Sequence, residues 1–130
     1  MGIHDRRRQQ RIGSSLKTSS AKAKGRNLQK WTRDKLLSLF ASLTTGDVRS
    51  TSMGASGEDI QLSPLARQCI PYQIETKAHA SFAIYKHYEQ AAEHGEHEPL
   101  LVIKGNHKKP LVVLDAEQFF KLIKKASNES

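Results

Sequence analysis

Apolar residues in the first third of the chain keep to one side of a predicted helix. The helix spans Asn27–Leu43, and the apolar spacing matches a single buried stripe. The stripe consists of Leu28, Trp31, Leu36, Leu39, Phe40 and Leu43. Thr44, Thr45 and Gly46 follow, and such residues end helices. We therefore expect the folded part to begin near Gly25 with a helix that covers a core.

The middle of the chain follows the two-residue period of a β-sheet. Asp47–Ser52 is a short β-branched run and predicts a first strand. In the second predicted strand, Ile60 and Leu62 point to one side and their polar neighbours point to the other. The returning strand, Tyr72–Lys77, alternates in the same way. We expect a hairpin with one apolar face and one charged face.

Further elements follow from local signals. Ser63 and Pro64 resemble a helix N-cap followed by proline at the first helical position. The remaining predicted elements are a helical turn at Leu65–Gln68, a helix at Ser81–His94, strands at Leu100–Lys104 and Leu111–Leu114, and a final helix opened by Asp115 and Gln118. The residues expected on the apolar sides of the two helices are Phe82, Tyr85, Tyr88 and Ala92, and then Phe119, Phe120 and Ile123. The order predicts an α/β domain at residues 25–126 with a mixed central sheet flanked by helices, followed by a frayed end at 127–130.

Composition limits the class of protein. A chain of 130 residues can bury the core of one domain. Its single cysteine, Cys69, excludes an internal disulfide and the usual cysteine-rich zinc sites. The sequence has no apolar run as long as a membrane span and no apolar stretch typical of a secretory signal. We therefore expect a cytoplasmic protein without a membrane partner.

The net charge of +8 is concentrated at the N-terminus. The first 26 residues carry +7, because Asp5 is their only acid, and the rest of the chain is almost neutral. The basic residues of this region are Arg6, Arg7, Arg8, Arg11, Lys17, Lys22, Lys24 and Arg26. Residues 1–24 lack apolar periodicity, so we expect an arm that is disordered when free and binds nucleic-acid phosphates. A solubilising tail, a localisation signal or a site for an acidic partner are alternatives.

The charged face of the hairpin is the main candidate for chemistry. Alternation brings Asp59, Glu75 and Lys77 to the same side of the sheet. Two carboxylates can hold a hard cation such as Mg²⁺, and the lysine would lie beside it. The alternative is a solvated sheet face, because Glu-x-Lys is common on strands.

The spacing of these residues resembles the signature of the PD-(D/E)XK nuclease superfamily. Glu75 follows Asp59 by sixteen positions, and Lys77 follows Glu75 by two. The order of elements is also similar to the αβββαβ core of that restriction-endonuclease-like fold. The resemblance implies a DNA endonuclease in which Asp59, Glu75 and the carbonyl of Thr76 bind Mg²⁺, or Mn²⁺ in its place. Lys77 would then activate the attacking water or stabilise the charged transition state.

Within that superfamily the chain looks most like small Holliday-junction resolvases of archaeal and phage type. The similar features are the Gly25-Arg26 pair before the first helix and the serine-rich stretch R-S-T-S-M-G. The resemblance implies a homodimer that cuts branched DNA in recombination, in a bacterial, archaeal or phage-infected cell. It also implies an assisting serine, either Ser50 or Ser52. Apolar residues left outside the core, particularly Tyr85, Tyr88 and those of the final helix, are the expected interface.

The chain departs from the family at Gln29, where family members often carry a metal-binding glutamate. An amide binds a divalent ion more weakly than a carboxylate, and an ordinary exposed helical residue is the alternative. Lys86 and Gln90 lie one helical turn apart and could face the site. Further residues expected to contact phosphate are Arg49, His79, His107, Lys108 and Lys109. We expect His94 and His97 to lie in a solvated turn rather than to bind metal.

Two other functions are compatible with the sequence. The protein could be a non-catalytic nucleic-acid-binding or assembly protein in which only the arm binds. It could also be a nuclease of the same fold that cuts linear or single-stranded DNA.

Overall fold

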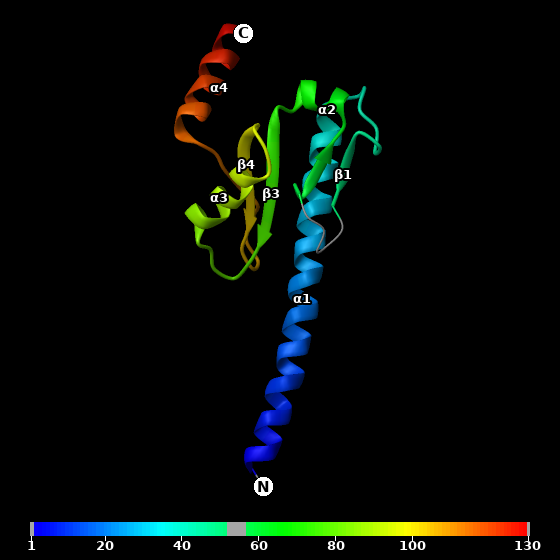
Figure 1. Ribbon diagram of the computed structural model, residues 1–130, viewed down its shortest axis with the longest axis vertical. Helices are drawn as coiled ribbons and strands as arrows, with labels where there is room; N and C mark the ends of the chain where they lie inside the picture. The colour runs from blue at the N-terminus through cyan, green and yellow to red at the C-terminus, as the bar shows by residue number, and fades with distance from the viewer. Residues whose placement is uncertain (1, 52–56, 130) are drawn as a thin grey trace.

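The protein is a mixed five-stranded sheet with helices against both faces, as the computed structural model in Figure 1 shows. The structure describes residues 2–51 and 57–129, and the side chains of 19–51 and 57–126. The elements are α1 (Gly2–Leu39), β1 (Val48–Ser50), β2 (Ile60–Leu62), α2 (Pro64–Cys69), β3 (Tyr72–Ala78), α3 (Ile84–Glu93), β4 (Glu98–Lys104), β5 (Leu111–Val113) and α4 (Ala116–Glu129). This confirms the predicted α/β class and the predicted order of elements.

The strands lie in the order β1-β2-β3-β4-β5. Only β3 and β4 are parallel, and every other neighbouring pair is antiparallel. Parallel neighbours need a crossover connection, which α3 provides. In Figure 1, α1 and α3 lie on opposite sides of β3. The central strand β3 therefore has one face toward each helix.

The face of the sheet toward α1 holds the main core. Val48, Ile60 and Ile74 have exposed fractions of 0 to 2%, and they pack with Leu28 of α1 and Val102 of β4. Side chains on a strand alternate between faces, so the residues between them must point toward α3. The predicted alternation along the second and third strands is confirmed.

The second face of the sheet packs against α3, but not through the predicted residues. His87 and Ala91 are the buried residues of α3, whereas Tyr85 is 85% exposed and Ala92 is exposed. The expected apolar side of this helix is therefore wrong at Tyr85 and Ala92, whereas Phe82 and Tyr88 are half-buried. The helix begins at Ile84, later than predicted, and hydrogen bonds from β3 to its C-terminal end fix which side meets the sheet. The spacing of the aromatic residues could not predict these hydrogen bonds.

The connection between α1 and α2 is fixed by one carboxylate. The helix α1 ends at Leu39 rather than at the predicted Leu43. Asp47 accepts hydrogen bonds from the Thr44 amide (2.9 Å) and hydroxyl (3.1 Å) and from the Ser63 hydroxyl (2.8 Å). Ser63 in turn caps α2 by accepting from the Ala66 amide at 3.1 Å. The predicted N-cap and helical turn are confirmed.

The helix α1 does not begin near Gly25, as the sequence predicted, but runs without a break from Gly2. Its N-terminal half extends well beyond the sheet and has no other element beside it (Figure 1). An isolated helix without a packing partner is marginal in water. This agrees with the expectation of an arm that is disordered when free.

The final helix, α4, leads away from the sheet (Figure 1). Asp115 accepts from the Gln118 amide at 3.0 Å, which confirms the predicted cap. The prediction that α4 buries its aromatic residues is wrong, since Phe119 and Phe120 are 50% and 61% exposed and Ile123 is 50% exposed. Because α4 projects from the sheet, its apolar side does not pack against the core. The helix continues to Glu129, and the fraying of 127–130 stays a prediction.

The helices in the described part of the chain include none with an apolar stretch sufficient to cross a membrane.

Candidate active site

Asp59 directly precedes β2 and its side chain reaches across to β3. Its backbone belongs to the sheet, because its amide donates to the Ile74 carbonyl (3.2 Å) and its carbonyl accepts from the Thr51 amide (2.8 Å). The carboxylate oxygen Oδ2 accepts from the Thr76 amide at 2.8 Å and from the Thr76 hydroxyl at 3.3 Å. The carboxylate therefore lies against β3, at the residue between Glu75 and Lys77.

Glu75 and Lys77 project from the same face of β3. The Lys77 ammonium nitrogen lies 3.4 Å from one carboxylate oxygen of Glu75. The other oxygen lies 3.0 Å from Nε2 of His94, directly after α3. Glu75 is only 6% exposed, while Lys77 and His94 are partly exposed. We call Asp59, Glu75 and Lys77 the candidate site.

The Glu75 carboxyl has a raised pKa. Burial raises the pKa of the Glu75 carboxyl, and the negative charge of Asp59 raises it further. Lys77 and His94 act in the opposite direction without cancelling these effects. The surroundings of Glu75 therefore disfavour its ionised form.

Gln73 explains why His94 reaches Glu75. Its side chain is fully buried, and its amide nitrogen donates to the carbonyls of Ala91 (2.6 Å), Ala92 (3.1 Å) and Gly95 (3.3 Å). Its amide oxygen accepts from the His97 backbone at 3.1 Å. These bonds attach the last turn of α3 to β3. The residue that follows this turn, His94, is thereby held over Glu75.

His94 lies in an exposed turn, as expected, but the docked end of α3 also brings its ring to Glu75, a contact that the sequence did not predict. His97 is exposed, and its bond to Gln73 uses only its backbone. The sequence places His94 at the end of a helix but does not show which residue its ring contacts. No sequence signal specifies this contact, because it depends on the tertiary docking of Gln73 against the end of α3.

Glu58, next to Asp59, does not belong to the candidate site. Both of its carboxylate oxygens accept from Arg67 at 2.6 Å. Arg67 also donates to the Tyr72 carbonyl at 2.7 Å, and the Thr51 hydroxyl donates to the Glu58 carbonyl. Arg67 thus joins α2 to the start of β3, and Glu58 is the acid that pairs with it.

The remaining candidate residues differ in how far they are exposed. Ser52 lies outside the described residues, and Ser50 on β1 is half-buried. Gln29 is 7% exposed, so it is not an ordinary exposed helical residue. Gln90 is half-buried, and within the described residues its amide oxygen has no hydrogen-bond partner. Lys86 is exposed on α3.

The basic residues expected to contact phosphate are accessible where their side chains are described. Lys22, Arg26, Arg49, His107, Lys108 and Lys109 are exposed. His79 is also exposed, and its ring lies 5.7 Å from that of Phe82 and 5.2 Å from that of His87. Lys24 donates to the Asn106 side chain at 2.8 Å. The side chains of Arg6, Arg7, Arg8, Arg11 and Lys17 lie outside the described part.

The donor set fits a hard divalent cation in chemical type. Asp59 and Glu75 offer carboxylate oxygens, and the Thr76 carbonyl is a further oxygen. Within residues 19–51 and 57–126, no three histidine, cysteine, aspartate or glutamate side chains are grouped to hold a metal ion. A metal in the candidate site would therefore rely on two carboxylates and backbone or solvent oxygens.

Comparisons with protein-family models, with curated proteins and with solved structures find no match for this chain. The resemblance to PD-(D/E)XK nucleases therefore depends only on the spacing of Asp59, Glu75 and Lys77 and on the order of the helices and strands.

Proposed function

We propose that the protein is a Mg²⁺-dependent DNA endonuclease of the PD-(D/E)XK type, with a restriction-endonuclease-like fold. The observation that carries the proposal is the hydrogen bond from the Thr76 amide to Asp59 at 2.8 Å. Through it, an acid distant in sequence lies beside the two residues that flank Thr76. A solvated sheet face would not need a buried glutamate, and Glu75 is 6% exposed.

Each residue of the candidate site has a distinct role in this proposal. Asp59, Glu75 and the Thr76 carbonyl would hold the cation, which when bound stabilises the negative charge that develops on the phosphate. Lys77 would orient the attacking water or take its proton. The water oxygen forms a bond to phosphorus while one phosphate ester bond breaks, and the leaving oxygen ends with a proton. Partial burial of Lys77 and Glu75 reduces competition from bulk water.

The preferred substrate in this proposal is a Holliday junction, and the active form is a homodimer. Such a junction has two equivalent strands to cut, so a two-fold dimer can present one candidate site to each. The charge distribution supports DNA as the partner, because +7 of the net charge lies in the first 26 residues. The exposed apolar side of α4 offers a surface for a second copy.

The test is cleavage of a four-way junction, a matched linear duplex and matched single strands by the purified protein with Mg²⁺. Cleavage of the junction should exceed that of the other two. Asp59→Asn, Glu75→Gln and Lys77→Ala should each reduce the rate by about 100- to 10,000-fold. Lys30→Ala, which removes an exposed lysine of α1, is the matched control and should cut normally.

Melting temperatures and DNA affinity of the variants separate lost chemistry from lost folding. Full cleavage by Lys77→Ala or Asp59→Asn would contradict the candidate site. Cleavage of linear DNA as fast as junctions would contradict only the preference for branched DNA. Binding without any metal-dependent cleavage would favour the non-catalytic alternative.

A further inference from the structure

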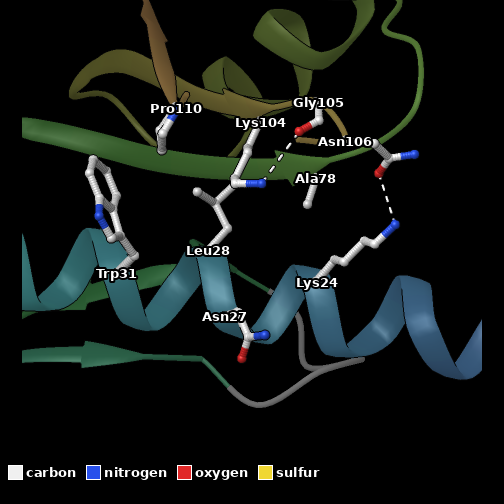
Figure 2. A pocket seen from close by; sticks show the side chains of 9 residues that line it. All are labelled: Lys24, Asn27, Leu28, Trp31, Ala78, Lys104, Gly105, Asn106 and Pro110. Atoms are coloured by element: carbon white, nitrogen blue, oxygen red, sulfur yellow. Dashed lines mark hydrogen bonds between the residues drawn. The ribbon is translucent and has the colours of Figure 1, made fainter. Parts of the chain in front are cut away.

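A pocket of about 300 Å³ lies between α1 and the end of the sheet, on the face opposite the candidate site. Its lining residues are Lys24, Asn27, Leu28 and Trp31 of α1, Ala78 of β3, and Lys104, Gly105, Asn106 and Pro110 around the β4–β5 turn. Figure 2 shows Lys24, Leu28 and Trp31 pointing from α1 toward the strands. We call this cavity the α1 pocket. Its volume is at the low end for small-molecule sites, which suits one nucleotide rather than a long segment.

The α1 pocket has an aromatic end. Trp31 is the only tryptophan in the chain and is 43% exposed, although it belongs to the helix face that covers the sheet. Pro110 lies at the same end on the sheet side (Figure 2), and Leu28 and Ala78 add apolar surface. A partly exposed indole beside a proline is a surface against which a planar ring can stack.

The other part of the α1 pocket is positively charged. The Lys24 ammonium donates to the side-chain oxygen of Asn106 at 2.8 Å, and that of Lys104 donates to the Gly105 carbonyl at 3.4 Å (Figure 2). Both acceptors are neutral, and the lining includes neither aspartate nor glutamate. An anionic oxygen makes a stronger hydrogen bond to an ammonium group than a neutral carbonyl does. The pocket thus combines a stacking surface with two cations suited to a phosphate.

The α1 pocket and the candidate site lie at the same end of β3. Ala78 lines the pocket, and Lys77 is the preceding residue, so the two side chains project from opposite faces of the strand. Lys104 pairs with Ala78 in the parallel register of β3 and β4, which places it on the pocket face. A DNA strand that passes around this end of the sheet could contact both the α1 pocket and the candidate site.

We propose that the α1 pocket binds one unpaired nucleotide, with the base stacked on Trp31 and the phosphate held by Lys24 and Lys104. The choice of DNA as the source of this nucleotide rests on the proposed function. The recognised chemistry itself, a planar base joined to a phosphate, is shared by free nucleotides and single strands. Stacking is tolerant of sequence because every base has an aromatic face.

The single tryptophan allows a direct test on the full chain without Mg²⁺, so that no cleavage occurs. Tryptophan fluorescence is titrated with a deoxynucleoside monophosphate, a short single strand, an abasic strand of equal length and a matched duplex. The monophosphate and the single strand should quench the emission. The abasic strand and the duplex should not, since neither presents an unpaired base.

The affinity of variants for a labelled single strand, measured by fluorescence anisotropy, tests the same site. Trp31→Leu should weaken binding by about five- to one-hundred-fold, as removal of a stacking partner does elsewhere. Trp31→Phe keeps an aromatic ring and should retain most of the affinity. Lys104→Ala should weaken both the single strand and the abasic strand. Leu65→Ala, which removes an apolar side chain that is 47% exposed on α2, is the control and should bind normally.

Equal quenching by the abasic strand, or unchanged affinity of a folded Trp31→Leu variant, would overturn the proposed nucleotide site. Quenching by the monophosphate but not by the single strand would assign the pocket to free nucleotides and overturn DNA as the source. These results are independent of cleavage. The pocket therefore stands if Lys77→Ala cuts DNA normally, and the proposed function stands if the pocket fails.

Discussion

Nε2 of His94 lies 3.0 Å from a carboxylate oxygen of Glu75, although the two residues are separated by a crossover helix. The contact limits how the Glu75 carboxylate can turn, since its other oxygen faces Lys77 at 3.4 Å. His94 is thus a positioning residue for the candidate site.

Replacing His94 should therefore impair the proposed nuclease without unfolding it. His94→Leu is expected to reduce cleavage or Mg²⁺ affinity by about 10- to 100-fold, as is typical for residues that orient metal-binding groups. His94→Gln retains a hydrogen-bonding side chain and should recover part of the loss. His97→Ala is the control, because His97 uses only its backbone in this region. Initial rates over a Mg²⁺ titration provide the measurement, and equal curves for His94→Leu and the unchanged protein would refute the role.

The attachment of α3 to β3 predicts a coupled loss of stability. A side chain at Gly95 would place its Cβ 2.7 Å from the amide oxygen of Gln73, whose side chain is held by four hydrogen bonds and cannot easily move. Gly95→Ala should cost about 1–3 kcal/mol in free energy of unfolding. Gln73→Ala should cost a similar amount, about 1–3 kcal/mol, because it leaves the buried Ala91 carbonyl without its donor.

The double variant tests whether the two residues act on one another. Once Gln73 is alanine, the clash is gone, so adding Gly95→Ala should cost much less than it does alone. Urea unfolding of the four proteins measures this coupling. Simple addition of the two costs would show that the close approach has no energetic consequence.

Stability should depend on pH through Asp47. Hydrogen bonds from the Thr44 amide, then from Ser63, hold the pKa of the Asp47 carboxyl below its ordinary value of 3.8. The unfolded chain binds this proton more tightly than the folded chain does. The stabilisation is therefore fully present above the unfolded pKa and is lost as the pH falls through the folded pKa.

The Asp47→Asn variant tests this pH dependence, since an asparagine side chain cannot ionise. Thermal unfolding should show the unchanged protein to be more stable than this variant at neutral pH, with the difference shrinking below pH 3.8. Asp34→Asn alters a carboxylate that is 65% exposed and should give a smaller difference. A constant gap between the unchanged protein and Asp47→Asn at all pH values would contradict the assignment.

The arm should contribute to DNA affinity mainly through charge. Deleting residues 2–20 removes five basic side chains but keeps Lys22 and Lys24. The slope of log affinity against log salt concentration on duplex DNA should decrease by about 0.9 for each phosphate that the shortened protein no longer neutralises. Lysine in place of Arg6, Arg7, Arg8 and Arg11 keeps the charge and should keep the slope. Identical slopes for the deleted and full-length proteins would assign the arm to another partner.

The exposed apolar side of α4 predicts self-association. Phe120 is 61% exposed, and Leu111 and Val112 of the edge strand β5 are 61% and 59% exposed. Such surface favours association between copies. Phe120→Ser should shift a dimer toward monomer in sedimentation equilibrium without lowering the melting temperature. Leu65→Ser is the control on α2, and a wild-type protein that sediments as a monomer at micromolar concentration would rule out the dimer.

The sequence by itself determined the order of the elements and the two faces of the hairpin. Alternation along a strand is a local property of the backbone, so Ile60 and Ile74 could be assigned to the core and Glu75 to the opposite face before any fold was known. The cap at Ser63 was predictable for the same reason, because its partner at Ala66 lies three residues away.

Tertiary structure alone decided which distant residues meet. His94 contacts Glu75 because Gln73 binds the end of α3, and no local pattern specifies that docking. Helical spacing predicted that α4 has an apolar side but not that the side stays uncovered, since burial depends on what packs against it. The α1 pocket likewise needs α1 and the β4–β5 turn together, and the residues that line it are as much as 86 positions apart in the chain, from Lys24 to Pro110.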